Sequence, residues 1–233
     1  MARKFLICGL GKFGMTLART MGASGADIIA VDNDIEHVND VKNDVSYSAA
    51  LDSTETKSLE AVGAAGVDVA VVAIGEAFES SVLTIAALKE LGVKEIICRA
   101  NSEREAKILR LTGATRVIQI EQDMAKKLAL ALITPNMVEL VELAEGYSII
   151  EWEVDDKFIG KQLIGCRFRA DYSVNVIAIR KAAKEDGDGE STELVPDPSY
   201  VFRKGDVIVV IGRAASMARL TGVAMGKGGA SAG

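Results

Sequence analysis

A glycine-rich turn between two apolar runs constrains this chain more than any other feature. The apolar run Phe5–Cys8 leads into Gly9-Leu10-Gly11-Lys12-Phe13-Gly14, a helical pattern follows, and the apolar run Ile28–Val31 ends on Asp32. A strand, a glycine turn, a helix, a second strand and an acid occur in this order in the βαβ units that bind dinucleotides. The order predicts an α/β fold that begins with such a unit.

The residues of this unit have separate mechanical roles. Gly9 permits a tight turn, Gly11 lets the backbone approach a diphosphate, and Gly14 lets the helix pack close to the strand. The free N–H groups at the start of the helix then face the phosphates. Asp32 follows at close to the spacing of about 20 residues expected for a carboxylate that binds ribose hydroxyls. This context favours nucleotide binding; the alternatives are a glycine turn that serves packing alone and an Asp32 that only caps the next helix.

Apolar runs and helical patterns continue to alternate at intervals of roughly 20–25 residues, as in successive βαβ units. Further strands are predicted at 45–49, 67–74, 95–99 and 116–120, and helices from residue 35 and at 55–62, 78–91, 102–111 and 122–133. The strands are almost entirely apolar, which predicts a parallel sheet covered on both faces. The expected strand order is 3-2-1-4-5-6, that of the Rossmann-like doubly wound fold.

Ligands of such folds bind across the carboxyl ends of the strands. In this chain those ends carry Gly9, Asp32, Ala50–Asp52, Gly75–Glu76 and Arg99. These residues are therefore expected to converge on one site.

The sequence predicts four segments: a nucleotide-binding domain at 1–134, a helical linker or hinge at 135–147, a small α+β domain at 148–223 and a flexible tail at 224–233. Thr134-Pro135 interrupts the helical pattern, because proline disfavours helix in the residue before it. A second helical stretch is expected at Met137–Ala144.

The small domain is expected to hold strands at 149–154, 174–180 and 207–211, a short helix at 159–164, and a polar, mobile loop at 183–192. At roughly 75 residues it is shorter than the substrate domain of a typical dehydrogenase.

Composition disfavours several classes of protein. The 233 residues are 49% apolar, yet no run approaches the roughly 18 apolar residues of a membrane span. The net charge of −6 disfavours broad nucleic-acid binding. Cys8, Cys98 and Cys166 are odd in number and far apart, which predicts a cytosolic chain without a disulfide framework. His37, the one histidine, is expected on the solvated surface, so neither a zinc site nor a Ser-His-Asp triad is supported.

Several further motifs occur in a fixed order. They are Ala30-Val31-Asp32, Val71–Gly75, Glu121–Ala125, Glu145–Glu151, Arg169–Tyr172 and Lys204-Gly205-Asp206. With the glycine turn, they resemble the RCK (KTN) family, built of a TrkA-N and a TrkA-C part. The resemblance covers nearly the whole chain, and a single pair of parts is similar to the KtrA type.

The resemblance implies a nucleotide-binding cytosolic regulatory subunit that gates a membrane potassium transporter or channel, and no enzyme. It implies an adenine nucleotide (ATP or ADP, NAD or NADH, or AMP), with a divalent cation near Glu121 at a dimer interface. It also implies a homodimer that assembles into an octameric ring beneath a membrane potassium-translocating subunit of the KtrB or TrkH type. Nucleic acid is not an expected partner.

The expected cofactor-binding residues are Gly9, Gly11, Lys12, Phe13, Gly14, Asp32, Asn33, Asp52, Gly75, Glu76 and Arg99. Lys12 stands where related proteins often present arginine to the terminal phosphates; lysine keeps the charge but loses the bidentate fork. The alternative is a solvated lysine on the first turn of the helix. Arg99 approaches the phosphates or pairs with a local acid. Asp52 meets adenine or its ribose, or caps its own loop. Glu121 is a metal ligand or simply an acid in the first turn of a helix.

Two alternatives to the regulatory subunit stay open at this point. One is an NAD-dependent oxidoreductase, and the other is a dimerisation module whose glycine turn binds nothing. The helix at 122–133 places Met124, Leu128 and Ala131/Leu132 near one face. This face is expected to pack on a second subunit or on its own sheet.

Overall fold

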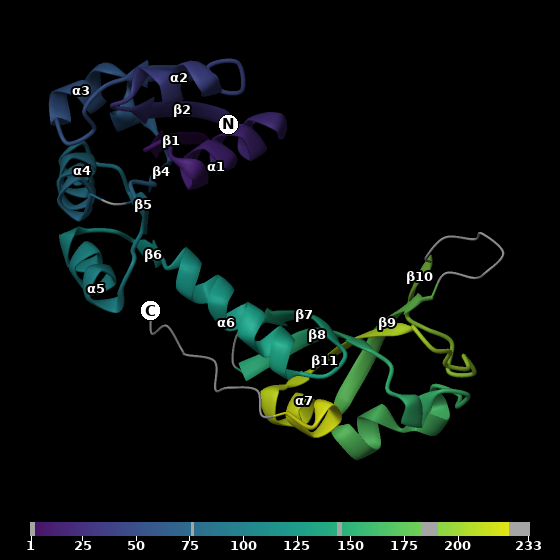
Figure 1. Ribbon diagram of the computed structural model, residues 1–233. Coiled ribbons are helices and arrows are strands. Elements are labelled where there is room, and N and C mark those ends of the chain that lie inside the picture. The colour runs from purple at the N-terminus through teal and green to yellow at the C-terminus, as the bar shows by residue number, and fades with distance from the viewer. Residues whose placement is uncertain (1–2, 76, 144–145, 183–190, 224–233) are drawn as a thin grey trace. The chain divides into compact units, whose positions relative to one another are not determined.

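The computed structural model describes residues 3–75, 77–143, 146–182 and 191–223 (Figure 1). Contacts between Cα atoms divide the chain into two compact units, 1–123 and 124–233. None of the helices in the described ranges combines the length and the apolar content that a membrane span requires.

The first unit is built on a six-stranded sheet in the order β3-β2-β1-β4-β5-β6, and every neighbouring pair is parallel. Its strands are β1 (Lys4–Cys8), β2 (Asp27–Asp32), β3 (Tyr47–Ala50), β4 (Val69–Val72), β5 (Glu95–Arg99) and β6 (Arg116–Ile118). The predicted doubly wound order is therefore confirmed.

Helices follow the strands, as the alternating pattern predicted. They are α1 (Lys12–Ala23), α2 (Ile35–Val41), α3 (Thr56–Ala61), α4 (Phe78–Glu90), α5 (Glu103–Thr112) and α6 (Ile120–Ile133), with a 3-10 turn at Ala64–Gly66. Local capping explains several starts: the Asp34 carboxylate accepts from Glu36 N–H, and the Ser102 hydroxyl accepts from Glu105 N–H. α6 ends at Ile133, directly before Thr134-Pro135.

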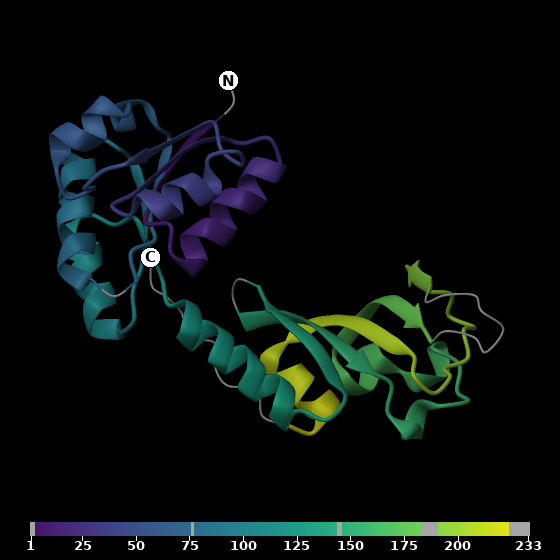
Figure 2. The same ribbon diagram turned by 45° about the horizontal axis from the view of Figure 1, so that its top comes forward.

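Helices cover both faces of the parallel sheet (Figures 1 and 2). One apolar cluster packs α3, α4 and α5 on the sheet through Leu59, Ile85 and Leu109. The other packs α1 and α2 through Ala18 and Val38. Burial on both faces explains why the strands are so uniformly apolar. Within these clusters, burial raises the pKa of the Cys8 and Cys98 thiols to about 12.

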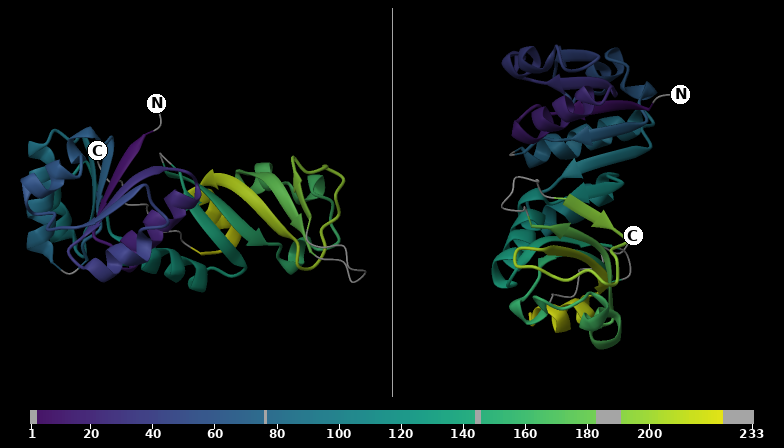
Figure 3. Two further views of the ribbon diagram at one scale, coloured as in Figure 1. Left: turned by 90° about the horizontal axis from the view of Figure 1, so that it is seen from above. Right: turned by 90° about the vertical axis from the view of Figure 1, so that its right-hand side faces the viewer.

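The second unit holds a five-stranded antiparallel sheet in the order β10-β9-β11-β8-β7, with α7 on one face (Figures 1 and 3). Its elements are β7 (Met137–Glu142), β8 (Tyr147–Glu153), β9 (Val174–Lys181), β10 (Ser191–Leu194), β11 (Val207–Arg213) and α7 (Ala214–Thr221). Short 3-10 turns lie at Asp156–Phe158 and Ile164–Cys166, and a π-helical turn at Phe168–Tyr172. The small α+β domain is thus confirmed.

The predicted helical stretch at Met137–Ala144 is wrong. Residues 137–142 form β7, which pairs with β8 from Met137 opposite Trp152 to Glu142 opposite Ser148. The apolar Met137 and Leu140 enter the core of the second unit. Pairing with a strand that lies later in the chain outweighs the helical preference of leucine and glutamate.

The predicted short helix at 159–164 is also wrong. Gly160 N–H donates to Phe202 O at 2.9 Å, and Leu163 N–H donates to Tyr200 O at 2.8 Å. These donors are therefore used across the fold and not within a helical turn. Gly160 has a φ of +77°, which no α-helical residue adopts.

Three other predictions fall partly or wholly on residues that the structure does not describe. The predicted polar loop at 183–192 lies outside the described residues up to 190, and Ser191 and Thr192 begin β10. The predicted tail at 224–233 lies outside them entirely, as does Glu76. Neither β10 nor α7 was predicted.

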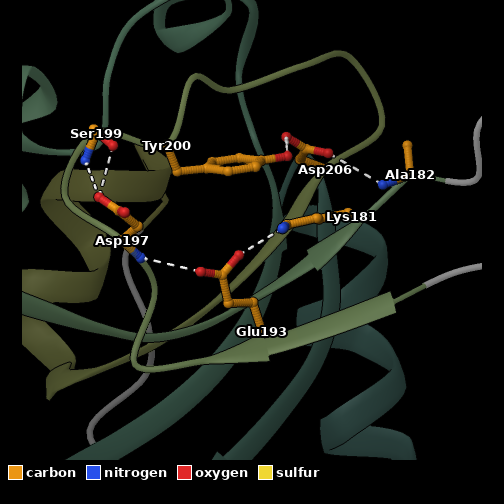
Figure 4. A network of polar contacts seen from close by, with 7 residues as sticks. All are labelled: Lys181, Ala182, Glu193, Asp197, Ser199, Tyr200 and Asp206. Atoms are coloured by element: carbon orange, nitrogen blue, oxygen red, sulfur yellow. Dashed lines mark hydrogen bonds and ion pairs between the residues drawn. The ribbon is translucent and has the colours of Figure 1, made fainter.

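A buried carboxylate joins the loop before β11 to the end of β9. Asp206 is fully buried and accepts hydrogen bonds from the Tyr200 hydroxyl at 2.8 Å and from Ala182 N–H at 3.1 Å (Figure 4). It also accepts one from Arg203 N–H at 2.8 Å. Burial, followed by the bond to Asp206, raises the pKa of the Tyr200 phenol. The protonated phenol is thus retained as a donor, and Asp206 has a structural role in the Lys204-Gly205-Asp206 motif.

Candidate functional site

A pocket of about 680 Å³ opens at the carboxyl ends of the strands in the first unit. It is lined by residues from the turn after β1, the end of β2, the loops after β3 and β4, and the end of β5. The lining residues are Gly9, Gly11, Lys12, Phe13, Asp32, Asn33, His37, Leu51, Asp52, Ser53, Thr54, Ala73, Ile74, Gly75, Ala77, Ser80 and Arg99. The site thus forms where the sheet order predicted it.

The glycine turn is shaped by close backbone contacts. Gly9 has a φ of +95°, and a Cβ on it would lie 3.0 Å from Ile74 N. A Cβ on Gly14 would lie 1.9 Å from Gly9 O, so only glycine allows α1 to pack this close to the turn. A Cβ on Gly11 would meet nothing within 4 Å. Gly11 therefore leaves open space beside the start of α1, where a helix offers free N–H groups to an anion.

Asp32 is held rigidly at the end of β2. Its carboxylate accepts hydrogen bonds from Leu10 N–H at 2.5 Å and from Asp34 N–H at 2.8 Å, and its side chain is 9% exposed. A carboxylate has about four acceptor positions. After these two bonds it retains capacity for two further donors, which is what a pair of ribose hydroxyls requires.

Asp52 caps its own loop, as one of its two predicted roles anticipated, whereas its contact with adenine or ribose stays a prediction. It lines the pocket, and its carboxylate accepts from the Thr54 hydroxyl at 2.7 Å and Thr54 N–H at 2.9 Å. These two bonds, the hydroxyl first, lower the pKa of Asp52. The loop after β3 is therefore closed by a carboxylate that is charged at neutral pH.

Arg99 brings positive charge to the end of β5. Its Nη2 pairs with Glu121 in the first turn of α6, as the ion-pair alternative anticipated. Its Nε is buried and has no hydrogen-bond partner in the structure. Gly75 gives the guanidinium room, since a Cβ there would lie 3.1 Å from Arg99 Nη1. The pocket thus holds a half-satisfied guanidinium next to the glycine after β4.

Glu121 does not line the pocket, and its side chain is 65% exposed. No group of three or more potential metal ligands (His, Cys, Asp or Glu) occurs among the described residues. The predicted role of Glu121 at a divalent cation stays a prediction.

Most predicted cofactor residues line this one pocket. Gly14 does not, because it sits beneath the turn, and Glu76 lies outside the described residues. His37 was expected on the solvated surface, but it lines the pocket with its Nδ1 3.5 Å from Asp32 Oδ1. The sequence could have predicted this position, because His37 lies one helical turn after Asp34, which caps the helix that follows Asp32. Ser53, Thr54, Ala73, Ile74, Ala77 and Ser80 were also missed, although most of them follow β3 or β4 closely.

The chain matches two family models, TrkA-N domain over residues 5–120 and TrkA-C domain over residues 148–222. It is 31% identical over 219 residues to Ktr system potassium uptake protein C of Bacillus subtilis (strain 168), covering 94% of this chain and 96% of that protein. It is 31% identical over 210 residues to Ktr system potassium uptake protein A of the same organism, covering 90% and 91%.

A solved structure of the GsuK channel bound to NAD has the same fold, with a TM-score of 0.66 at 15% identity. The superposition covers 98% of this chain and 40% of the channel chain. The resemblance seen in the motifs is confirmed by these matches, and the chain belongs to the family of TrkA-N and TrkA-C domain proteins.

Proposed function

We propose that this chain is a nucleotide-binding regulatory subunit of a potassium uptake system. The observation that carries the proposal is the pocket at the strand ends, in which the glycine turn, the oriented Asp32 carboxylate and Arg99 converge. The kinship with Ktr system potassium uptake proteins supplies the process in which such a pocket would act.

The ligand is an adenine nucleotide. Asp32 would accept from the ribose hydroxyls, and the open backbone at Gly11 with the start of α1 would receive the phosphates. Lys12 and Arg99 supply positive charge on the phosphate side. A solved structure of a channel with this fold is described as bound to NAD, which supports the same ligand class here.

Regulation would follow from differential binding. A nucleotide shifts an assembly between two shapes only by the difference in its affinity for them. ATP, ADP and NAD differ at the phosphate end, where Lys12 and Arg99 lie. We place the chain on the cytoplasmic side of the membrane, as a homo-oligomer in contact with the potassium-translocating subunit, and assign it no catalytic residue.

The first test is to denature freshly purified protein and identify any nucleotide released, and then to measure binding by calorimetry. Asp32→Ala should weaken AMP, ADP, ATP and NAD together by about tenfold to a hundredfold, the cost of losing hydrogen bonds to a charged group. Asp32→Asn keeps one acceptor oxygen and should fall between.

The matched control is Asp27→Ala, which removes a carboxylate from the opposite end of β2. Its ion pair with Lys4 is long at 3.9 Å, so this variant should bind like the wild type. Unchanged affinity in Asp32→Ala would remove Asp32 from the site. Hydride transfer from a bound nicotinamide to a small substrate would favour the oxidoreductase alternative.

A further inference from the structure

The imidazole of His37 faces the carboxylate that orients the ribose end of the pocket. His37 lies in the first turn of α2, and its Nδ1 is 3.5 Å from Asp32 Oδ1. That nitrogen is buried and forms no hydrogen bond, whereas the side chain as a whole is 44% exposed. A buried polar atom without a hydrogen-bond partner needs an explanation, and the Asp32 carboxylate beside this one provides it.

The charge of this imidazole bears directly on the carboxylate. Asp32 keeps two free acceptor positions after its bonds to Leu10 and Asp34 N–H. A neutral His37 leaves the negative charge of Asp32 uncompensated. An imidazolium would offset that charge at the place where the ribose 2′ position is expected.

Building on the proposed function, we propose that His37 is a specificity-determining residue that sets the selectivity between a ribose 2′-hydroxyl and a 2′-phosphate. A carboxylate at this position favours the hydroxyl of NAD, and a cation beside it accommodates the phosphate of NADP. Asp32 and His37 place both groups in one site. NAD is therefore preferred while His37 is neutral, and the penalty against NADP falls when His37 carries a proton.

Several other charged groups lie near His37. Lys12, Asp32, Asp52 and Arg99 line the same pocket, and Asp34, Glu36 and Asp40 lie close to His37 in the sequence, at the start of α2 or within it. These groups are the same in every variant compared below, so a difference between the variants comes from position 37.

The test measures dissociation constants of NAD and NADP at pH 6 and pH 8 for wild type, His37→Gln and His37→Arg. Glutamine stays neutral and arginine stays charged. The 2′-phosphate itself titrates near about pH 6. The titration of free NADP is the same for every variant, so it cancels when the NADP-to-NAD affinity ratios of two variants are divided at the same pH.

The ratio of His37→Arg should exceed that of His37→Gln by about threefold to fivefold at both pH values, the size of one partly exposed charge pair. The wild-type ratio should lie between those of the two variants, and nearer to that of His37→Arg at pH 6 than at pH 8. His37 is the sole histidine in the sequence, so its single imidazole proton resonance should also shift when either nucleotide binds.

Equal ratios in wild type and His37→Gln at both pH values would overturn the role of His37 while leaving nucleotide binding intact. A wild type that binds none of ATP, ADP, NAD or NADP would instead overturn the proposed function, and the inference with it. Because the side chain is partly exposed, both variants should fold, and the His37→Arg measurement decides the matter independently if glutamine perturbs α2.

Discussion

Among single residues, Arg99 stands out because a ligand phosphate has to compete with Glu121 for it. Its guanidinium lines the pocket and is paired with Glu121, while its Nε has no partner. An incoming phosphate offers Arg99 a second anion. Glu121 therefore reduces the attraction of Arg99 for phosphate as long as no cation intervenes.

Removing this competition should strengthen phosphate binding. Glu121→Gln should raise the affinity for ATP by about twofold to fivefold in the absence of divalent cations, a range set by the exposure of the Glu121 side chain. Its effect on AMP should be smaller, because AMP extends less far toward Arg99. Calorimetry in a chelating buffer checks both.

Asp123→Asn is the matched control, because it removes a second acid from the same first turn of α6. Repeating the titrations with Mg²⁺ separates the two roles considered for Glu121. If Glu121→Gln loses ATP affinity only with Mg²⁺ present and gains none without it, the residue acts as a cation ligand and the competition does not exist.

A site residue could be predicted when the sequence around it determines its position. Asp32 and Arg99 end strands, and the end of a buried strand is visible in the sequence as the end of an apolar run. His37 was missed because its approach to Asp32 depends on how α2 is rotated against the sheet, which only tertiary packing decides. The pairing of Arg99 with Glu121 was anticipated only as an ion pair with some local acid.

At the level of elements, the turn between β1 and α1 contains two glycines with different roles. One is required for packing and the other leaves space for a ligand. Gly14 has no room for a Cβ, whereas Gly11 has open space beside it and a φ of −63° that any residue adopts. The same substitution at the two positions should therefore fail for different reasons.

Gly14→Ala should lower the free energy of unfolding by about 2–4 kcal/mol, because α1 has to move away from Gly9 O to relieve the overlap. Gly11→Ala should change it by less than about 1 kcal/mol, yet weaken nucleotide binding by at least tenfold by occupying the phosphate space. Chemical denaturation and calorimetry on both proteins measure the two effects. A Gly11→Ala protein that binds ATP and NAD normally would show that the phosphates lie elsewhere.

The elements of the first unit were more predictable than those of the second. Parallel strands buried on both faces are continuous apolar runs, and each is followed by a helix with a recognisable start. β7 carries Glu139 and Glu142 among its apolar residues, so its sequence suits a helix as well as a strand. Only its partner β8, which comes later in the chain, decides between them.

At the level of the whole molecule, α6 has an apolar face that is exposed among the residues that the structure describes. No residue of α6 is buried, and Met124, Leu128 and Leu132 are 58%, 59% and 77% exposed. These residues recur every four positions, so they lie along one side of the helix. Such a contiguous apolar surface is typical of an interface between protein chains.

The protein should accordingly be at least a dimer at micromolar concentration, and family resemblance extends this expectation to an octamer. Leu128→Glu should shift the mass measured by light scattering toward the monomer, since a charge in the apolar face would be desolvated on association. Ala129→Glu, one position further around the exposed helix, is the control and should associate normally. A wild type that stays monomeric with and without nucleotide contradicts the assembly.

The indole of Trp152 has a practical consequence for such measurements. It is the sole tryptophan of the sequence, it is buried in the second unit, and its Nε1–H donates to Pro135 O, in the segment that directly follows α6. The nucleotide pocket contains no indole of its own. The intrinsic fluorescence of Trp152 therefore reports on the second unit. A change in its emission wavelength or intensity on addition of nucleotide would show that binding alters the second unit as well as the pocket.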